Sequence, residues 1–246
     1  MTSRRDFLKQ GSTAFGGALL AGSALAGIPR LLAAAPAPDP RALEAFTDIA
    51  NVRALMDAAL NAAKMAGATY ADVRCSRQRQ NFVFTREQQI QQVVDTDTVG
   101  IGVRALVDGT WGFAATRILT TDGAAAAARE AVAIARASRI ARATPIEWLP
   151  APVVKDGVWK SAFTQDPFEI PVEQKAELLL KANAAALKAK HVKYVFSGFF
   201  FVKDERNYAN TDGTVTKQDV VRSWPTLQIT AVSSDFTDFQ NRSNMV

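Results

Sequence analysis

The run Val99–Thr116 constrains the fold of this chain more than any other segment, because it predicts a tight β-hairpin. Apolar and polar residues alternate up to Asp108-Gly109, and a second alternating run follows that pair. Asp-Gly between two such runs is a strong hairpin signal. Glycine is also unusually dense here, and a strand glycine usually marks a bulge or the close approach of another backbone. The glycines of the run are Gly100, Gly102, Gly109 and Gly112.

The segments around this hairpin predict a sheet between two helices. Apolar residues at helical spacing predict a helix over 41–66, ended by Gly67. A second, Ala-rich helix is expected over Thr120–Ala141, with Thr121 or Asp122 as its cap. Between the helices we expect a meander of about five strands, which suggests an antiparallel sheet covered on one face. The predicted strands are 70–76, 81–86, 89–94, 99–107 and 111–115.

The second half of the chain predicts a further helix followed by strands. Thr144–Pro171 contains five prolines and reads as an extended connection. A helix is expected from Pro171, as its first residue, to about Lys190, with Leu178, Leu179 and Leu187 facing inward. Strands are expected at 193–203, 206–210, 214–221 and 226–233, with a turn at 210–213. The fold class expected is therefore α+β, with antiparallel sheets packed with helices, as helix–meander–helix followed by a second helix–strands unit.

The first 35 residues are typical of a twin-arginine export signal. Arg4 and Arg5 precede an uncharged stretch, Gly11–Ile28, that is rich in Gly, Ala and Ser. Such a stretch makes a poor permanent membrane anchor, so we expect none after cleavage. Cleavage is plausible after 24–26 or after 33–35, and residues 36–44 read as a linker. The alternative is a chance Arg-Arg pair before a membrane helix. The signal predicts export to the periplasm.

Charge and cysteine content restrict the function further. The net charge is +5. Most of that excess lies in the predicted signal, so a nucleic-acid partner is not expected. Cys75 is the only cysteine, which excludes an intramolecular disulfide. We expect it to be a half-buried strand residue, although its charged neighbours Arg74 and Arg77 leave a reactive thiol as an alternative.

The sequence offers few groups for catalysis. A zinc site needs three or four Cys, His, Asp or Glu ligands, and His191 is the only histidine. We expect His191 to be a solvated helix terminus rather than a ligand. The pairs of neighbouring carboxylates are expected to be solvated turn or strand-end residues rather than hydrolytic acids. These pairs are Asp95 with Asp97, Asp204 with Glu205, and Asp235 with Asp238.

Two aromatic stretches leave alternatives open. Basic and aromatic residues interleave between Arg74 and Arg86, a pattern that can stack single-stranded nucleic acid. The preferred interpretation is a strand with Phe82 and Phe84 on one face. The region from Tyr194 to Phe201 is dense in aromatic residues and indicates core or an interface with a partner.

Four stretches resemble the TldD/PmbA family, whose members are related to metallopeptidases. Ala68–Arg74 is similar to the family's first strand, and Val99–Thr116 to its signature stretch. The Ala-rich segment Ala124–Ala137 and Gln165–Pro167, ahead of a helix and the turn Asn210–Thr214, follow in the family's order. The resemblance covers roughly residues 45–235.

The resemblance implies a non-catalytic role for this part of the chain. Residues 45–235 would be the family's N-terminal domain, which shapes a peptide channel, and 236–246 would begin a missing C-terminal domain. That domain carries a His-Glu-x-x-x-His zinc motif, which is absent here, so no cofactor is expected in this chain and zinc is expected in the full-length protein. The matched positions, expected to be structural or channel-lining, are Gly100, Gly102, Arg104, Asp108, Gly109, Trp111, Gly112 and Phe113.

The family also implies partners. We expect a like subunit, in a homo- or hetero-oligomer, and a peptide substrate. The chain is then the inactive N-terminal part of an exported zinc metallopeptidase. The alternative is a metal-free binding or assembly module that pairs with a full-length family member.

Overall fold

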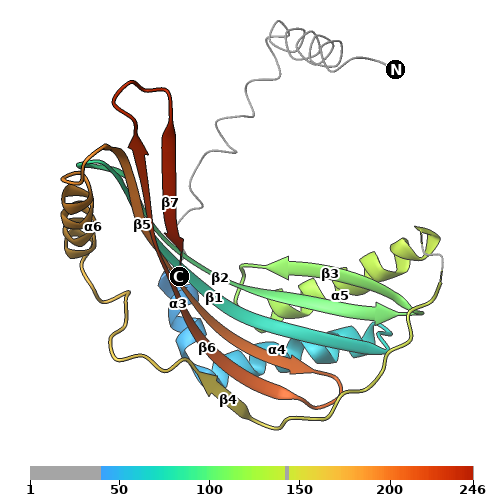
Figure 1. The fold of residues 1–246 in the computed structure, drawn as a ribbon. Coiled ribbons are helices and arrows are strands. Elements are labelled where there is room, and N and C mark those ends of the chain that lie inside the picture. Colours follow the sequence, from blue (N-terminus) through green and yellow to red (C-terminus); the bar gives the residue numbers. More distant parts are fainter. Residues whose placement is uncertain (1–39, 142–143, 246) are drawn as a thin grey trace, which may run out of the picture. The chain divides into compact units, whose positions relative to one another are not determined.

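The computed structural model describes residues 40–141 and 144–245, and the predicted signal with Arg4 and Arg5 lies outside them. Figure 1 shows the elements. The helices are α3 (Pro40–Thr47), α4 (Ile49–Met65), α5 (Thr121–Ser138), the 3₁₀ turn η2 (Arg139–Ala141) and α6 (Val172–Ala186). The strands are β1 (Tyr70–Arg86), β2 (Gln89–Val107), β3 (Thr110–Thr116), β4 (Gly157–Lys160), β5 (Val192–Asn210), β6 (Val215–Val232) and β7 (Phe239–Met245). No described helix has the length and apolar character needed to cross a membrane.

The described strands form one seven-stranded sheet in the order β3-β2-β1-β5-β6-β4, with β7 also on β6. All neighbours are antiparallel except β4 and β6. The expected α+β class with an antiparallel sheet and packed helices is confirmed.

The strands are longer than the sequence pattern predicts. The predicted strands 70–76 and 81–86 are one strand, β1, and β2, β5 and β6 each join two predicted strands in the same way. On β1 and β2 the pattern is lost between the predicted pieces because both faces of the sheet are polar there. Arg77, for example, binds Asp97 on β2 at 2.7 Å (Nη2 to Oδ2). Charges paired between neighbouring strands continue a sheet where apolar alternation stops.

The first predicted helix is two helices, α3 and α4, because Asp48 interrupts it. The Asp48 backbone is extended, and its Oδ1 accepts a hydrogen bond from the Ala50 N–H at 2.9 Å. This is N-cap geometry, which starts a new helix at Ile49. Asp48 was not predicted as a cap, although Asp is among the residues that the position favours.

The ends of the other helices also differ from the prediction. Thr120 caps α5 by accepting a hydrogen bond from the Gly123 N–H at 3.0 Å, so neither Thr121 nor Asp122 is the cap. Pro171 is the N-cap of α6 rather than its first residue. Leu179 is buried as expected, whereas Leu178 is exposed and lines an open pocket together with Phe199 of β5.

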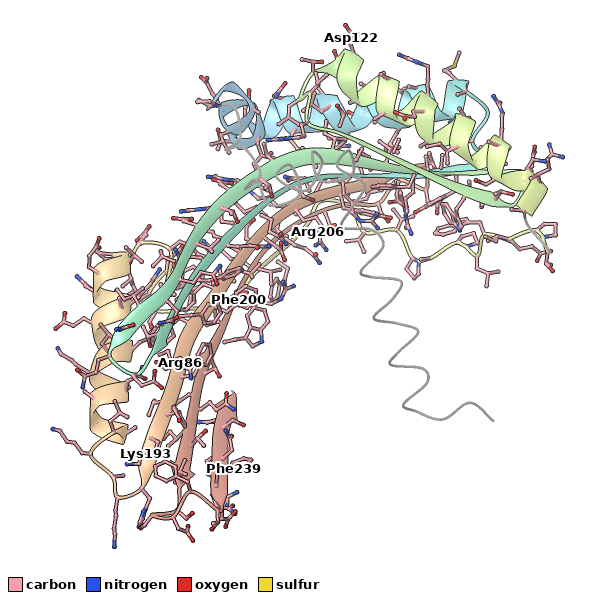
Figure 2. All side chains as sticks on the ribbon, turned by 90° about the horizontal axis from the view of Figure 1, so that it is seen from above. Arg86, Asp122, Lys193, Phe200, Arg206 and Phe239 are labelled. Carbon is pink, nitrogen blue, oxygen red and sulfur yellow. The ribbon has the colours of Figure 1, made fainter. Side chains whose placement is uncertain are left out.

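The helices form two layers, α4 with α5 and α6 alone, and both layers cover the same face of the sheet. Odd-numbered residues of β1 contribute to both apolar clusters: Val73 and Cys75 pack with α4 and α5, and Val83 packs with α6. Residues two apart on a strand share a face, and no register shift interrupts β1 between these positions. Figure 2 shows α4 and α5 over one end of the sheet and α6 beside the other. We call this the helix-bearing face, and the opposite one the helix-free face.

The larger apolar cluster lies under α4 and α5, and it depends on one glycine. A Cβ at Gly112 of β3 would lie 2.0 Å from the Ala131 carbonyl oxygen and 2.4 Å from the Ala135 nitrogen. Both atoms belong to the α5 backbone, so α5 packs directly on β3. The predicted close approach at the glycine-rich hairpin is therefore confirmed for Gly112.

Two strands were not predicted, and both pair with β6. β4 lies within the segment expected to be an extended connection, and β7 lies within the polar run after Ser233. Neither strand shows a clear alternation of buried and exposed residues, because most of their described side chains are exposed. Their strand conformation comes from backbone pairing with β6 instead.

Candidate functional site

The helix-free face is the candidate binding surface, because no described helix covers it. Even-numbered residues of β1, with their partners on the neighbouring strands, form this face. It has three parts: an aromatic and ionic group near the hairpin, a polar centre, and an aromatic patch at the end that lies opposite α6. Phe200 and Arg206 of β5, both on this face, mark the patch and the polar centre (Figure 2).

The ionic group near the hairpin is built around a buried carboxylate. Asp72 is fully buried, and its two oxygens accept hydrogen bonds from Arg74 Nη1 at 2.7 Å and Arg104 Nη2 at 2.6 Å. The hydrogen bond that Arg104 donates to Asp72 raises the pKa of Arg104, against the opposing effect of burial. A buried carboxylate is costly unless paired, so both arginines compensate its charge. Arg104, a predicted signature residue, also lies over the Trp111 ring at 5.0 Å.

The aromatic group beside it is covered by the connection between α5 and β4. Trp148 of that connection stacks on Tyr70 at 3.6 Å between ring centroids, and Trp111 meets Tyr70 edge-on at 5.8 Å. Trp148 Nε1 donates to Asp212 Oδ2 at 3.0 Å, which fixes the connection to the β5–β6 turn. Burial raises the pKa of Tyr70 well above its ordinary value. The signature residue Trp111 is thus part of a closed aromatic group.

The remaining signature residues lie in and around the same hairpin. Asp108 and Gly109 form its turn, both with positive φ, as the Asp-Gly signal predicts. Gly102 lies beneath Phe113, because a Cβ there would be 3.1 Å from the Phe113 ring. Phe113 itself is 56% exposed, so among the aromatic signature residues it is the one available to a ligand. A Cβ at Gly100 would lie 3.1 Å from the Thr116 carbonyl oxygen.

The polar centre contains a buried carboxylate that sequence reasoning placed at a strand end. Asp204 lies within β5 and accepts hydrogen bonds from Gln78 Nε2 at 2.9 Å and Arg222 Nη1 at 2.6 Å. Its neighbour Glu205 points to the other face, because consecutive strand residues alternate. The two cannot act as a catalytic pair. Arg206, two residues from Asp204, forms no ion pair with another described residue.

The other predicted carboxylate pairs are placed as follows. Asp95 and Asp97 lie within β2, not at its end, which corrects the prediction. Asp97 pairs with Arg77 and is therefore not a free hydrolytic group. Asp235 and Asp238 lie in the exposed turn between β6 and β7, as expected.

The aromatic patch joins residues from β1, β5 and β6. Phe200 lies 4.2 Å from Phe82 and 4.9 Å from Trp224 between ring centroids, and Phe84 stacks on Phe196 at 5.6 Å. None of these five side chains is fully buried. The preferred interpretation of Phe82 and Phe84 is confirmed, since both lie on one face of β1. The dense aromatic region of β5 is split between the two faces of the sheet. Phe196 and Phe200 lie in the patch, whereas the adjacent Phe199 and Phe201 lie on the helix-bearing face.

One glycine makes room for this patch. A Cβ at Gly198 would lie 2.3 Å from Cδ1 of Phe84, so only glycine allows that ring to lie across β5. The signal for the patch was present in the sequence as alternating aromatic residues on β1 and β5. What the sequence did not show is that the strands pair in a register that places these rings side by side.

A cavity of about 570 Å³ lies on the other side of the sheet, between α4 and strands β4 and β6. Its lining is mostly apolar, with Val52 and Met56 from α4 and Val158 from β4. Arg53 and Asp156, 3.5 Å apart (Nη1 to Oδ1), bridge its two walls. It holds no cluster of catalytic side chains.

Comparison with known proteins assigns the family. The model of the PmbA/TldA metallopeptidase domain 1 matches residues 71–135, and that of the PmbA/TldA metallopeptidase central domain matches residues 165–245. Together they span more than half of the chain. The chain belongs to the PmbA/TldA family. A comparison with curated protein sequences found no match.

Several solved structures share this fold. A proposed modulator of DNA gyrase from Thermotoga maritima has a TM-score of 0.56 and 14% identity, over 78% of this chain and 42% of its own. A second such protein, from Bacteroides thetaiotaomicron, has a TM-score of 0.54 and 16% identity, over 79% and 46%. TldE from Thermococcus kodakarensis has a TM-score of 0.54 and 14% identity, over 78% of this chain and 42% of its own. The chain spans less than half the length of each.

The described residues of this PmbA/TldA chain do not fit a zinc site. No three His, Cys, Asp or Glu side chains among them are grouped so that they could hold a metal ion. His191 is exposed just beyond α6, with φ of 68°. Cys75 is fully buried rather than half-buried, and burial raises the pKa of its thiol to about 12. A thiol in that environment stays protonated and is a poor ligand or nucleophile.

Proposed function

We propose that this chain is the non-catalytic, peptide-binding part of an exported PmbA/TldD-type zinc metallopeptidase. The observation that carries the proposal is the match to two metallopeptidase-family domains, neither of which brings a metal-binding group among the described residues. The catalytic zinc is proposed to belong to the part of the family's length that this chain does not match. No catalytic step is assigned to the residues described.

The helix-free face is proposed to meet the peptide. Its aromatic patch offers ring faces to apolar side chains, and the guanidinium of Arg206 offers donors to peptide carbonyl or carboxylate oxygens. These groups lie on one sheet face, so a peptide in extended conformation can contact both. A like subunit, in a homo- or hetero-oligomer, is proposed to complete the channel.

The test is peptide binding by the purified chain. We expect a fluorescein-labelled, capped peptide of nine residues, alternating Val and Thr with a central Lys, to bind in an anisotropy titration. Trp224→Ala should weaken binding about two- to tenfold, the range for loss of an aromatic contact. The matched control is Phe163→Ala, which removes a partly exposed ring from the connection after β4. Equal losses in the two variants would contradict a role for the patch.

Export through the twin-arginine pathway is proposed from the sequence alone. Replacing Arg4 and Arg5 together with Lys should stop the protein from accumulating in the periplasm. The check is fractionation of cells that express the original and the variant. Equal periplasmic amounts of the two proteins would show that another route is used.

A further inference from the structure

The outer edge of β2 is open over more than half of that strand. β1 pairs with β2 along its whole length, whereas β3 pairs with it only from Ile101 to Val107. Among the described residues, no strand pairs with the outer edge from Gln89 to Gly100. We call these twelve residues the open edge. Such an edge presents a row of backbone N–H and C=O groups that match another strand in spacing and direction.

The open edge lacks two features that often prevent strand pairing, Lys and Pro, and its charged residues are Asp95 and Asp97. Native proteins protect edge strands with charged side chains, above all Lys, with Pro, with β-bulges or with a short length. The open edge contains neither Lys nor Pro. The ladder with β1 shifts register only near Gln91, close to one end. The remaining residues, from Gln92 onward, form a regular strand that can accept a partner.

Side chains along the open edge indicate what the partner carries. Val93 and Asp95 both point to the helix-bearing face, since their β1 partners are Val83 and Asn81. Val93 is 48% exposed, so an apolar side chain beside it would bury surface of both. Asp95 is exposed and forms no hydrogen bond or ion pair with another described residue.

Lys175 does not neutralise Asp95 through a hydrogen bond or an ion pair. The ammonium of Lys175 interacts with Asp95 electrostatically, but it is buried and binds Asn81 Oδ1 at 2.7 Å. Burial is the main cause that lowers the pKa of Lys175, ahead of the opposing effect of Asp95. A basic side chain on an added strand would therefore meet an accessible carboxylate.

We propose that the open edge binds an extended peptide by strand addition, with an apolar residue beside Val93 and a basic residue two positions away, beside Asp95. This inference rests on the proposed function, that the chain binds peptide, and assigns the peptide a second contact site at the edge of the sheet. Backbone hydrogen bonds give the affinity, and alternate side chains give the preference. A second copy is a poorer occupant, because its open edge carries two aspartates and no basic residue.

The test uses the lysine-centred peptide described above and two N-methylated forms of it. An added strand hydrogen-bonds to β2 through one edge only, and the N–H groups of that edge belong to alternate residues. Methylation of the odd-numbered or of the even-numbered nitrogens should therefore have unequal effects. We expect one form to bind at least tenfold more weakly and the other to stay within about twofold. Equal affinities of the two forms would overturn strand addition.

Charge reversal on the protein tests the preference for a basic residue. Asp95→Lys should weaken binding of the lysine-centred peptide and strengthen binding of the same peptide with a central Glu. The matched control, Asp57→Lys, reverses an exposed charge on α4 and should change neither affinity. If Asp95→Lys changes neither affinity, the assignment of Asp95 is wrong.

The outcomes separate this inference from the proposed function. If Trp224→Ala weakens binding and the two methylated forms bind equally, the peptide lies on the helix-free face and the edge proposal fails alone. If none of the peptides binds, both proposals fail. If sedimentation shows a dimer that Asp95→Lys dissociates, the edge joins two copies and the peptide proposal is overturned.

Discussion

Gly112 sets the distance between β3 and α5. A side chain at this position would collide with backbone atoms of α5, which cannot rotate away as a side chain can. The alternating pattern marked four glycines in the hairpin without distinguishing among them. Only the position of α5 distinguishes Gly112 from the other three, because the close approach is to a helix that the strand pattern does not describe.

Gly112→Ala should therefore destabilise the protein by about 1–3 kcal/mol or more, the range for overpacked cores. Gly102→Ala is the matched control in the same hairpin. Its added Cβ would meet the exposed ring of Phe113, which can move, so the loss should be smaller. Thermal unfolding of both variants, monitored by circular dichroism, tests which variant loses more stability. A smaller loss for Gly112→Ala would contradict direct packing of α5 on β3.

At the scale of elements, the pairing of strands determined features of the sheet that local sequence patterns could not predict. The hairpin, the Ala-rich helix and α6 were all predicted, because each has a strong periodic or turn signal. The long strands were predicted in pieces, since the pairs that carry them through the polar centre, such as Arg77 with Asp97, join residues far apart in sequence. The aromatic patch was missed for the same reason, because its rings meet only through strand register.

The connection before α6 is fastened to the sheet by an ion pair. Asp166 accepts a hydrogen bond from Lys203 Nζ at 2.7 Å, and its other oxygen accepts one from the Phe168 N–H at 2.9 Å. Burial alone would raise the pKa of Asp166, but these hydrogen bonds outweigh it and the net shift is downward. A carboxyl with a depressed pKa stabilises the fold above its unfolded pKa and loses that effect as pH falls through the folded value.

Asp166→Asn should lower the stability at pH 7 by about 1–3 kcal/mol, as for hydrogen bonds to a charged group. The difference from the original protein should shrink as pH falls below about 4, where the carboxyl becomes protonated. Urea unfolding at several pH values measures this. Asp57→Asn, in an exposed pair on α4, should show almost no loss at pH 7. A difference that is constant with pH would contradict the ionic role of Asp166.

For the whole molecule, the two helical layers differ in the cores that they cover. The cluster under α4 and α5 has many buried apolar residues, whereas the one under α6 has three: Val83, Ala176 and Leu179. Local opening is easiest where few apolar contacts hold a region. Native-state hydrogen exchange should therefore show slower exchange in the part of β1 near Val73 than in the part near Val83. Faster exchange near Val73 would reverse this ranking.

The long ladder between β1 and β5 has a consequence for how this family can vary. β1 lies in the segment matched by the first domain, and β5 lies in the segment matched by the central domain. Fifteen residue pairs join the two strands, from Asp72 with Asn210 to Arg86 with Phe196. What counts as two modules in sequence is thus one folding unit in space. If recombination replaced one module with that of a distant relative, the new strand would have to pair with the strand of the other module along the whole β1–β5 ladder.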